Sequence, residues 1–389
     1  MTVQLDAGAA AACGGTFCSN SPIVQNAERV LFLKRPGDPL TTAVVQIQAT
    51  GNDPDFAWVV PLDSVPENVH EEASQTFAPL DRLTAPVYQF FGGARFSVGT
   101  GSSGFGCGAS EATVGAAPRE ADGVPNVQVW AMGETGNYAF SVVSSDNPDA
   151  LRRWLDTNGY RTPESAVPII AEYVAENKYF LAVRLRALQG VPAFAVTPLA
   201  FSYRGRGPCV PIRLTRIATA PTLPVLTYVI SDRRGVPLNF AQTAVSDAEV
   251  ARLGPTRFST APMAQGQLTP YDQLVTDAVT EAGGRAWITE YAGELPDGAD
   301  ANFSPMLRAA LPAQPYLTRM YTTISTASMD RDPEFAFVSG LPDVSNVHDL
   351  SRYADSGSAF DPAFLALGSL VGSAALHLRR RARRRAKTA

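Results

Sequence analysis

Few side chains in this sequence are of the types that carry out acid–base or nucleophilic chemistry. Histidine, the usual base of a serine or cysteine hydrolase, occurs only at positions 70, 348 and 377. His377 lies in an apolar stretch near the C-terminus, which leaves His70 and His348 as candidate ligand-site residues. Single histidines are more often packed or solvated, and no GxSxG, HExxH or P-loop motif accompanies these two.

A second group of candidate ligand-site residues is acidic. Asp330 and Asp332 alternate with other residues in the run DRDPE, and alternating carboxylates can serve as calcium ligands. Arg331 and Pro333 interrupt the run, and the remaining ligands of a calcium loop are missing. We therefore interpret this run as a solvated turn in preference to a metal site.

The four cysteines are candidates for disulfide bonds. Cys13 and Cys18 can close a small loop, which would leave Cys107 and Cys209 as the second pair. An even count is typical of an oxidising compartment, and four cysteines allow three connectivities, among which the sequence does not choose. A zinc site would need further ligands near these cysteines, so we expect no metal.

One glycine-rich segment matches a dinucleotide-binding pattern. Residues 99–104 read GTGSSG, but the pattern binds a pyrophosphate only where a helix begins, and the next residues are FGCGAS. A flexible insert over residues 92–122 fits this composition better, and no cofactor is expected.

Charge is distributed unevenly along the chain. The net charge is −5, yet the last eleven residues carry seven basic groups and no acid, so the remainder is acidic. An acidic body is a poor nucleic-acid binder over most of its surface.

An uncharged segment precedes this basic tail. Residues 363–378 read AFLALGSLVGSAALHL, and as a helix they would span about 24 Å, slightly less than the roughly 30 Å of a bilayer core. Snorkelling arginines can cover the difference, and the positive-inside rule then places residues 379–389 in the cytoplasm. The alternative is a soluble amphipathic helix with a nucleic-acid-binding end.

The N-terminus carries part of an export signal. Residues 1–12 end in small residues before Cys13 but lack a basic region and a full apolar region. We interpret residues 1–12 as a signal remnant and residues 13–355 as an extracytoplasmic region, for which a division into two subdomains is an alternative to a single domain. Lipidation of Cys13 and a chain that is not exported are the alternatives.

Apolar periodicity and turn signals predict an α+β fold with mixed, mainly antiparallel sheets, several short helices and a C-terminal transmembrane helix. The tryptophans at 58, 130, 154 and 287 each lie in an apolar element, which predicts packing in the core. Helices are expected at 67–83, 148–158, 163–177, 271–282 and 303–310. Strands are expected at 28–33, 42–49, 56–60, 124–132, 138–143, 179–187, 212–217, 226–230, 286–291 and 316–325.

Several of these segments resemble a known bacterial family. CGGTFC at 13–18, QIQATG at 46–51, FAWVVPLDSVP at 56–66 and YLTRMYTTIS at 316–325 are similar to the family of domain of unknown function 2330. The resemblance covers nearly the whole region before the predicted anchor. It implies an exported protein, often with a C-terminal anchor, and it supplies no catalytic residues.

Together these observations predict a membrane-anchored extracytoplasmic protein that acts as a non-enzymatic binding or interaction module. Its expected partners are the lipid bilayer and an envelope protein or glycan, whereas nucleic acid is not expected. An envelope hydrolase with an unrecognised carboxylate or histidine site is the alternative. A cytosolic protein with a nucleic-acid-binding tail is a third possibility.

Overall fold

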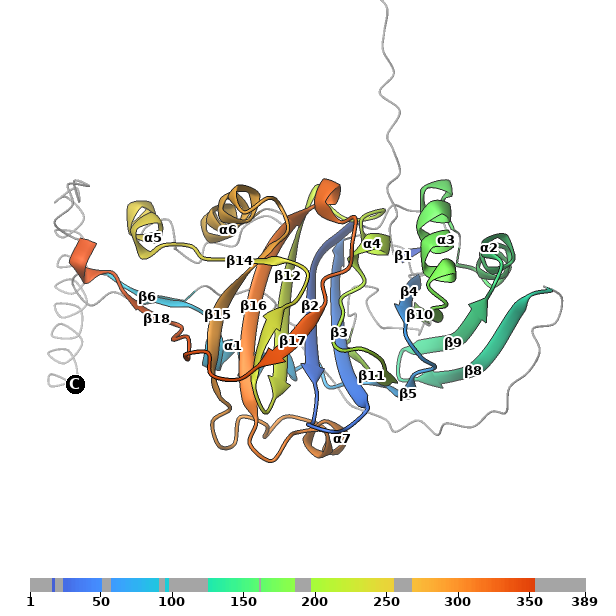
Figure 1. Ribbon diagram of the computed structural model, residues 1–389, viewed down its shortest axis with the longest axis horizontal. Helices are drawn as coiled ribbons and strands as arrows, with labels where there is room; N and C mark the ends of the chain where they lie inside the picture. Colours follow the sequence, from blue (N-terminus) through green and yellow to red (C-terminus); the bar gives the residue numbers. More distant parts are fainter. Residues whose placement is uncertain are drawn as a thin grey trace, which may run out of the picture.

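A computed structural model describes residues 16–17, 24–50, 57–90, 95–97, 125–160, 162–185, 197–254 and 268–353. The fold is α+β, with mainly antiparallel sheets and several short helices, as the sequence predicts (Figure 1).

An eight-stranded sheet forms the centre of the molecule, in the order β14-β15-β16-β12-β2-β3-β11-β5. Two neighbouring pairs, β2 with β12 and β14 with β15, are parallel, and the other pairs are antiparallel. The strands are β2 (Val24–Leu33), β3 (Leu40–Thr50), β5 (Glu67–Glu71), β11 (Leu199–Arg204), β12 (Thr222–Ser231), β14 (Ala241–Thr243), β15 (Ala286–Glu294) and β16 (Tyr316–Ser325).

A five-stranded antiparallel sheet, in the order β1-β4-β10-β9-β8, packs against one side of the central sheet. Its strands are β1 (Thr16–Phe17), β4 (Ala57–Leu62), β8 (Val127–Thr135), β9 (Tyr138–Ser145) and β10 (Tyr179–Leu185). The strands predicted at 124–132 and 138–143 correspond to β8 and β9, which form a hairpin with a turn at Gly136 and Asn137. Glu71 of β5 accepts a hydrogen bond from the Asn137 amide at 2.6 Å, which ties this turn to the central sheet.

Two smaller sheets complete the strand arrangement. In the first, β13 (Arg234–Pro237) pairs with β17 (Phe335–Val338). In the second, β6 (Val87–Gln89) lies between β7 (Arg95–Ser97) and β18 (Val347–Asp349).

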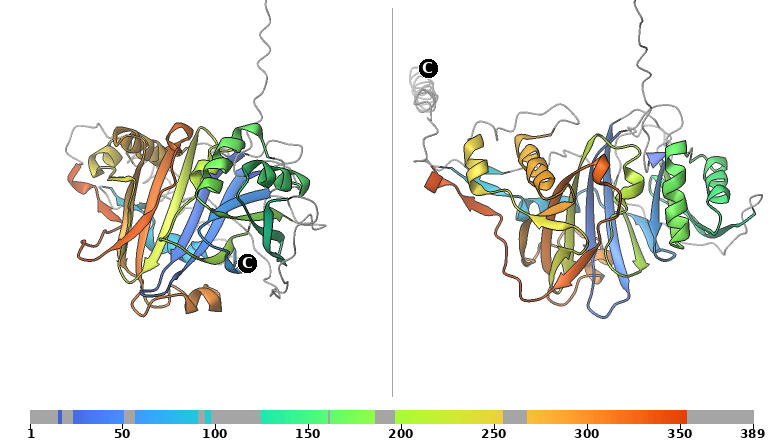
Figure 2. Two further views of the ribbon diagram at one scale, coloured as in Figure 1. Left: turned by 45° about the vertical axis from the view of Figure 1, so that its right-hand side comes forward. Right: turned by 45° about the horizontal axis from the view of Figure 1, so that its top comes forward.

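The helices cover the outer faces of the two large sheets, so that three apolar cores separate the layers. One core lies between the sheets, a second lies under α1, α5 and α6, and a third lies under α2 and α3 (Figures 1 and 2). The helices are α1 (Phe77–Thr84), α2 (Pro148–Thr157), α3 (Val167–Ala175), α4 (Ile212–Thr215), α5 (Asp247–Leu253), α6 (Pro270–Glu281) and α7 (Pro305–Ala309), with 3-10 turns at Glu164–Ala166, Thr326–Ser328 and Ser351–Tyr353.

The helix predicted for residues 67–83 is wrong over its first half. Residues 67–71 form β5, which pairs with β11, and only residues 77–84 are helical. Asn68 adopts a φ of 55°, a left-handed conformation that a right-handed helix excludes. Pairing with an edge of the central sheet therefore overrides the local helical pattern.

The strand predicted for residues 212–217 is also wrong, because residues 212–215 form the short helix α4. The helical turn sends Ile212 into the core between the sheets and Leu214 into the core under α2 and α3. The strand predicted for residues 56–60 extends further than expected, because β4 ends at Leu62 and includes Pro61. β1 pairs only with Ala57 and Trp58, so that side of β4 has no described strand at Pro61.

Several predictions concern residues outside the described ranges. These are the signal remnant at 1–12, the anchor at 363–378, the tail at 379–389, and Cys13, Cys18 and Cys107. Within the predicted insert at 92–122, residues 95–97 form β7 instead of a loop. Of the helices built from described residues, none is long and apolar enough to cross a membrane.

Candidate functional site

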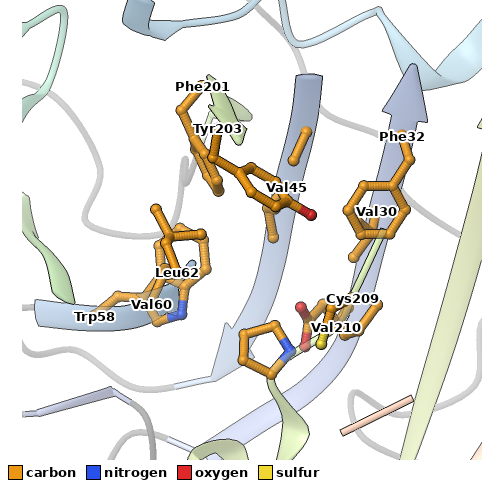
Figure 3. A pocket seen from close by; sticks show the side chains of 13 residues that line it. Val30, Phe32, Val45, Trp58, Val60, Leu62, Phe201, Tyr203, Cys209 and Val210 are labelled. Carbon is orange, nitrogen blue, oxygen red and sulfur yellow. The ribbon is translucent and has the colours of Figure 1, made fainter. Parts of the chain in front are cut away.

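A small cavity lies between the two large sheets (Figure 3). Its volume is about 20 Å³, which is room for about one water molecule. Most of the lining is apolar, and Glu28 and Cys209 bring a carboxyl and a thiol to it. The lining residues are Glu28, Val30, Phe32, Ala43, Val45, Trp58, Val60, Leu62, Phe201, Tyr203, Cys209, Val210 and Pro211.

Strand periodicity explains which side chains reach this cavity. Every second residue of a strand points to the same face, so Glu28, Val30 and Phe32 of β2 all face the five-stranded sheet. Trp58, Val60 and Leu62 of β4 face them from the other sheet. Glu28 thus occupies a position at which the alternation of β2 predicts an apolar residue.

Glu28 is only 4% exposed. Gln25 Nε2 donates a hydrogen bond of 3.0 Å to Glu28 Oε2. Burial raises the pKa of Glu28 to about 7; the Gln25 hydrogen bond opposes this shift and the charge of Asp332 adds to it. The Glu28 carboxyl can therefore gain or lose a proton near neutral pH.

Cys209 is the one cysteine among the described residues, and it forms no disulfide bond with any of them. Burial raises the pKa of its thiol well above the usual value, and the charge of Asp332 acts in the same direction. A protonated thiol is a poor nucleophile. The arrangement therefore favours a packing role for Cys209 over a nucleophilic one.

Asp332 lies beside the cavity, where its carboxylate is fully engaged. It accepts hydrogen bonds from Tyr173 Oη at 2.8 Å, from the Arg213 amide at 3.0 Å and from Arg213 Nε at 3.1 Å. The Arg213 guanidinium stacks 4.0 Å from the centre of the Tyr173 ring and also binds Glu176. These contacts fix the segment before β17 against α3 and α4.

Asp330 has a different environment from Asp332. It is partly exposed and forms two hydrogen bonds, of 2.7 and 2.6 Å, with Arg285. The Arg285 hydrogen bonds lower the pKa of Asp330. The two acids therefore do not converge on a common point, and no group of three or more His, Cys, Asp or Glu side chains in the described ranges could hold a metal ion.

The two candidate histidines are also far from each other. His70 lies on β5, where Nε2 faces Glu72 Oε2 at 3.3 Å and Nδ1 faces the Asn68 carbonyl at 2.9 Å. His348 lies on β18, where it stacks on Tyr88 and pairs with Asp247 at 2.8 Å. β5 is an edge strand of the central sheet, and in Figure 1 β18 lies beyond the opposite edge of that sheet, so the structure does not bring the histidines together.

A buried polar network fills part of the core under α1 and α6. Arg319 of β16, only 1% exposed, binds Glu290 of β15 at 2.6 Å and Asp81 of α1 at 3.0 Å. Tyr271 donates a hydrogen bond of 2.7 Å to Glu290, and Tyr228 donates one of 2.6 Å to Asp81. We call these five residues the Arg319 network. Their polar groups bind one another, which indicates a structural role.

Trp130 is an exception to the predicted packing of the tryptophans. Trp58, Trp154 and Trp287 are buried as expected, but Trp130 on β8 is 40% exposed. Buried and exposed residues alternate along β8, so Trp130 is exposed like Gln128, whereas Val127 and Val129 are buried. The register of β8 and β9 shifts between Val129 and Ala131, which leaves Trp130 without a paired residue on β9. The prediction of core packing is therefore wrong for this residue.

Two contacts hold the exposed indole in place. Trp130 Nε1 donates a hydrogen bond of 2.8 Å to Ser144 Oγ on β9, and the Tyr179 ring of β10 lies 5.5 Å away with its plane inclined by 71°. We call Trp130 and Tyr179 the aromatic corner. Period-two alternation could have revealed it, because Trp130 is in register with the exposed Gln128 and out of register with the buried Val127 and Val129.

Comparison with known proteins identifies the family. A sequence model described as an uncharacterized protein conserved in bacteria, DUF2330, matches residues 7–335. The chain belongs to this family. The resemblance drawn from the sequence motifs is thus confirmed, whereas no functionally curated protein matches the chain significantly.

Two solved structures show a distant likeness, both of baculovirus P35. One, a mutated P35 after caspase cleavage, is 11% identical and has a TM-score of 0.26, with 52% of this chain and 66% of that chain covered. The other is 9% identical and has a TM-score of 0.31, with 82% of this chain and 98% of that chain covered.

Proposed function

We propose that this chain is a membrane-anchored extracytoplasmic protein and a non-enzymatic binding module of the cell envelope. The observation that carries the binding role is the exposed Trp130, held rigidly by Ser144 and Tyr179 at one end of the five-stranded sheet. Exposed tryptophan is scarce on monomer surfaces and frequent at the centre of binding sites.

The surroundings of Trp130 support a binding face. Met132, two residues along β8, is 50% exposed. Within the described ranges β8 is the outermost strand of its sheet, and an outer strand offers backbone donors and acceptors to a partner. Apolar side chains and an available strand edge therefore occur on the same element.

The position of β8 fits attachment through the C-terminus. In Figure 1, β8 lies at one end of the long axis, and β18 and the last described turn, Ser351–Tyr353, lie at the other. If residues 363–378 cross the bilayer, the binding face points away from the membrane. The expected partners are thus the lipid bilayer at one end and an envelope protein or glycan at the other.

Two measurements on the full chain test this proposal. Protease added to intact cells should digest the main domain and spare a tag placed after residue 389, and protection of the main domain would contradict the proposed location. Purified protein should co-sediment with isolated envelope, and Trp130→Ala should reduce the bound fraction by roughly tenfold, as expected for a central aromatic contact. Equal sedimentation of the variant would contradict the binding face.

A second candidate function, an envelope hydrolase, is favoured by one observation. Glu28 has a pKa of about 7 and lines a cavity with room for one water molecule, which suits a general acid or base. Hydrolysis of an envelope polymer that is abolished in Glu28→Gln and unaffected in Trp130→Ala would support this function over the binding module.

A further inference from the structure

The aromatic corner is built from three neighbouring strands. Trp130 comes from β8, its hydrogen-bond acceptor Ser144 from β9, and Tyr179 from β10. β9 lies between β8 and β10 and pairs with both, so backbone hydrogen bonds fix the distance between the Trp130 and Tyr179 rings. The two ring planes meet at 71° and form two walls of different orientation.

Rigidity makes this corner suited to recognition. The indole N–H is already satisfied by Ser144, which restricts rotation of the Trp130 ring, and the Tyr179 ring blocks one side. A ligand that stacks here does not have to order a mobile side chain, and this lowers the entropic cost of binding. Because the N–H is engaged, the corner offers the π faces of its rings to a ligand.

Polar groups surround the two rings. Gln128 pairs with Ser144 across β8 and β9, so its exposed side chain lies on the same face as Ser144. Tyr179 pairs with Leu62, which places the adjacent Lys178–Asp63 ion pair at the other side. The corner therefore has the exposed Gln128 amide beside its aromatic rings, and Lys178 and Asp63 beyond Tyr179 bind each other.

We infer that the aromatic corner binds a pyranose ring of an envelope glycan. A pyranose presents C–H bonds on its faces, which stack on aromatic rings, and hydroxyls around its edge, which match the polar groups beside Trp130 and Tyr179. This inference rests on the proposed function and names the ligand class of the same face.

The test uses two defined probes with the full chain in detergent: the β-1,4-linked tetramer of N-acetylglucosamine and protease-treated peptidoglycan sacculi. Calorimetry follows the tetramer and sedimentation follows the sacculi. Trp130→Ala and Tyr179→Ala should each weaken binding by roughly tenfold or more, the loss typical of a central aromatic contact. Trp130→Phe, which keeps a ring, should retain part of the affinity.

Leu238→Ala is the control, because Leu238 is 63% exposed and follows β13, outside the five-stranded sheet and its binding face. It should bind both probes as the unaltered chain does, and equal unfolding midpoints would show that all variants fold. Absence of binding to both probes, or equal binding by Trp130→Ala, overturns the inference. If Trp130-dependent binding requires envelope that has not been treated with protease, the partner is a protein; the binding module then stands and the glycan inference falls.

Discussion

Replacing Glu290 with leucine should destabilise the fold strongly, because Glu290 is the buried partner of Arg319. Both side chains are 1% exposed, and the carboxylate of Glu290 binds Arg319 Nε at 2.6 Å and Tyr271 Oη at 2.7 Å. Among the described residues, the substitution leaves the buried guanidinium groups of Arg319 and Arg29 to share the carboxylate of Asp81. Removal of one partner from a buried ion pair typically costs about 3–5 kcal/mol.

The assay is urea unfolding of the full chain followed by circular dichroism. Glu294→Leu is the matched control, because Glu294 ends the same strand and is exposed, so its free energy of unfolding should change by no more than about 0.5 kcal/mol. Combining Glu290→Leu with Arg319→Met should recover part of the loss, since the unpaired charge is then absent. A loss below about 1 kcal/mol for Glu290→Leu would refute the structural role of the network.

Three further predictions concern pH and backbone strain. Burial opposes the charged form of His70, but its hydrogen bonds to Glu72 and the Asn68 carbonyl outweigh this effect and raise its pKa. The unaltered chain should therefore have a larger free energy of unfolding than His70→Gln. This difference should be full below pH 6.5 and should decline as pH rises through the raised pKa of His70. A difference in urea unfolding that does not depend on pH would contradict this prediction. Glu28 has its pKa raised from 4.5 to about 7, so its ionisation destabilises the fold as pH rises between these values, by about 3 kcal/mol in total. Glu28→Gln should therefore gain stability relative to the unaltered chain between pH 5 and pH 8 in the same assay. Gly136 has a φ of 50° and its added Cβ would collide with the Glu71 carboxylate, whereas Gly37 has a φ of 73° and open space around it. Gly136→Ala should accordingly lower the thermal midpoint more than Gly37→Ala, and equal shifts would show that the Glu71 contact is dispensable.

The sequence predicted most long strands because their pattern follows from burial. Residues 316–325 form β16 with the predicted limits, and all but the two end residues of this strand are buried. Residues 67–71 and 212–217 were misassigned because long-range partners decide their conformation. β5 exists through its pairing with β11, and α4 is fixed through the contacts of Arg213 with Asp332.

The candidate site was less predictable than the fold. Glu28 could have been noticed in the sequence, because period-two alternation places this acid on the same buried face as Val30 and Phe32. A buried acid among apolar residues indicates a special role. The acids at 330 and 332 were noticed in the sequence, but periodicity does not show that Asp332 is buried against Tyr173 while Asp330 is exposed with Arg285. Trp130 was assigned to the core from its apolar neighbours, although period-two alternation places it opposite the buried Val127 and Val129.

The parallel pairing of β2 with β12 has a consequence for synthesis of the chain. Val225 pairs with Glu28, a partner made about 200 residues earlier, so the contact order of the central sheet is high and its formation slow. Until β12 leaves the ribosome, one edge of β2 has no strand beside it, and the apolar residues of β2 and β3 stay accessible. The central sheet therefore stays incomplete until β12 has been synthesised, and its exposed apolar strands need protection against aggregation during that time.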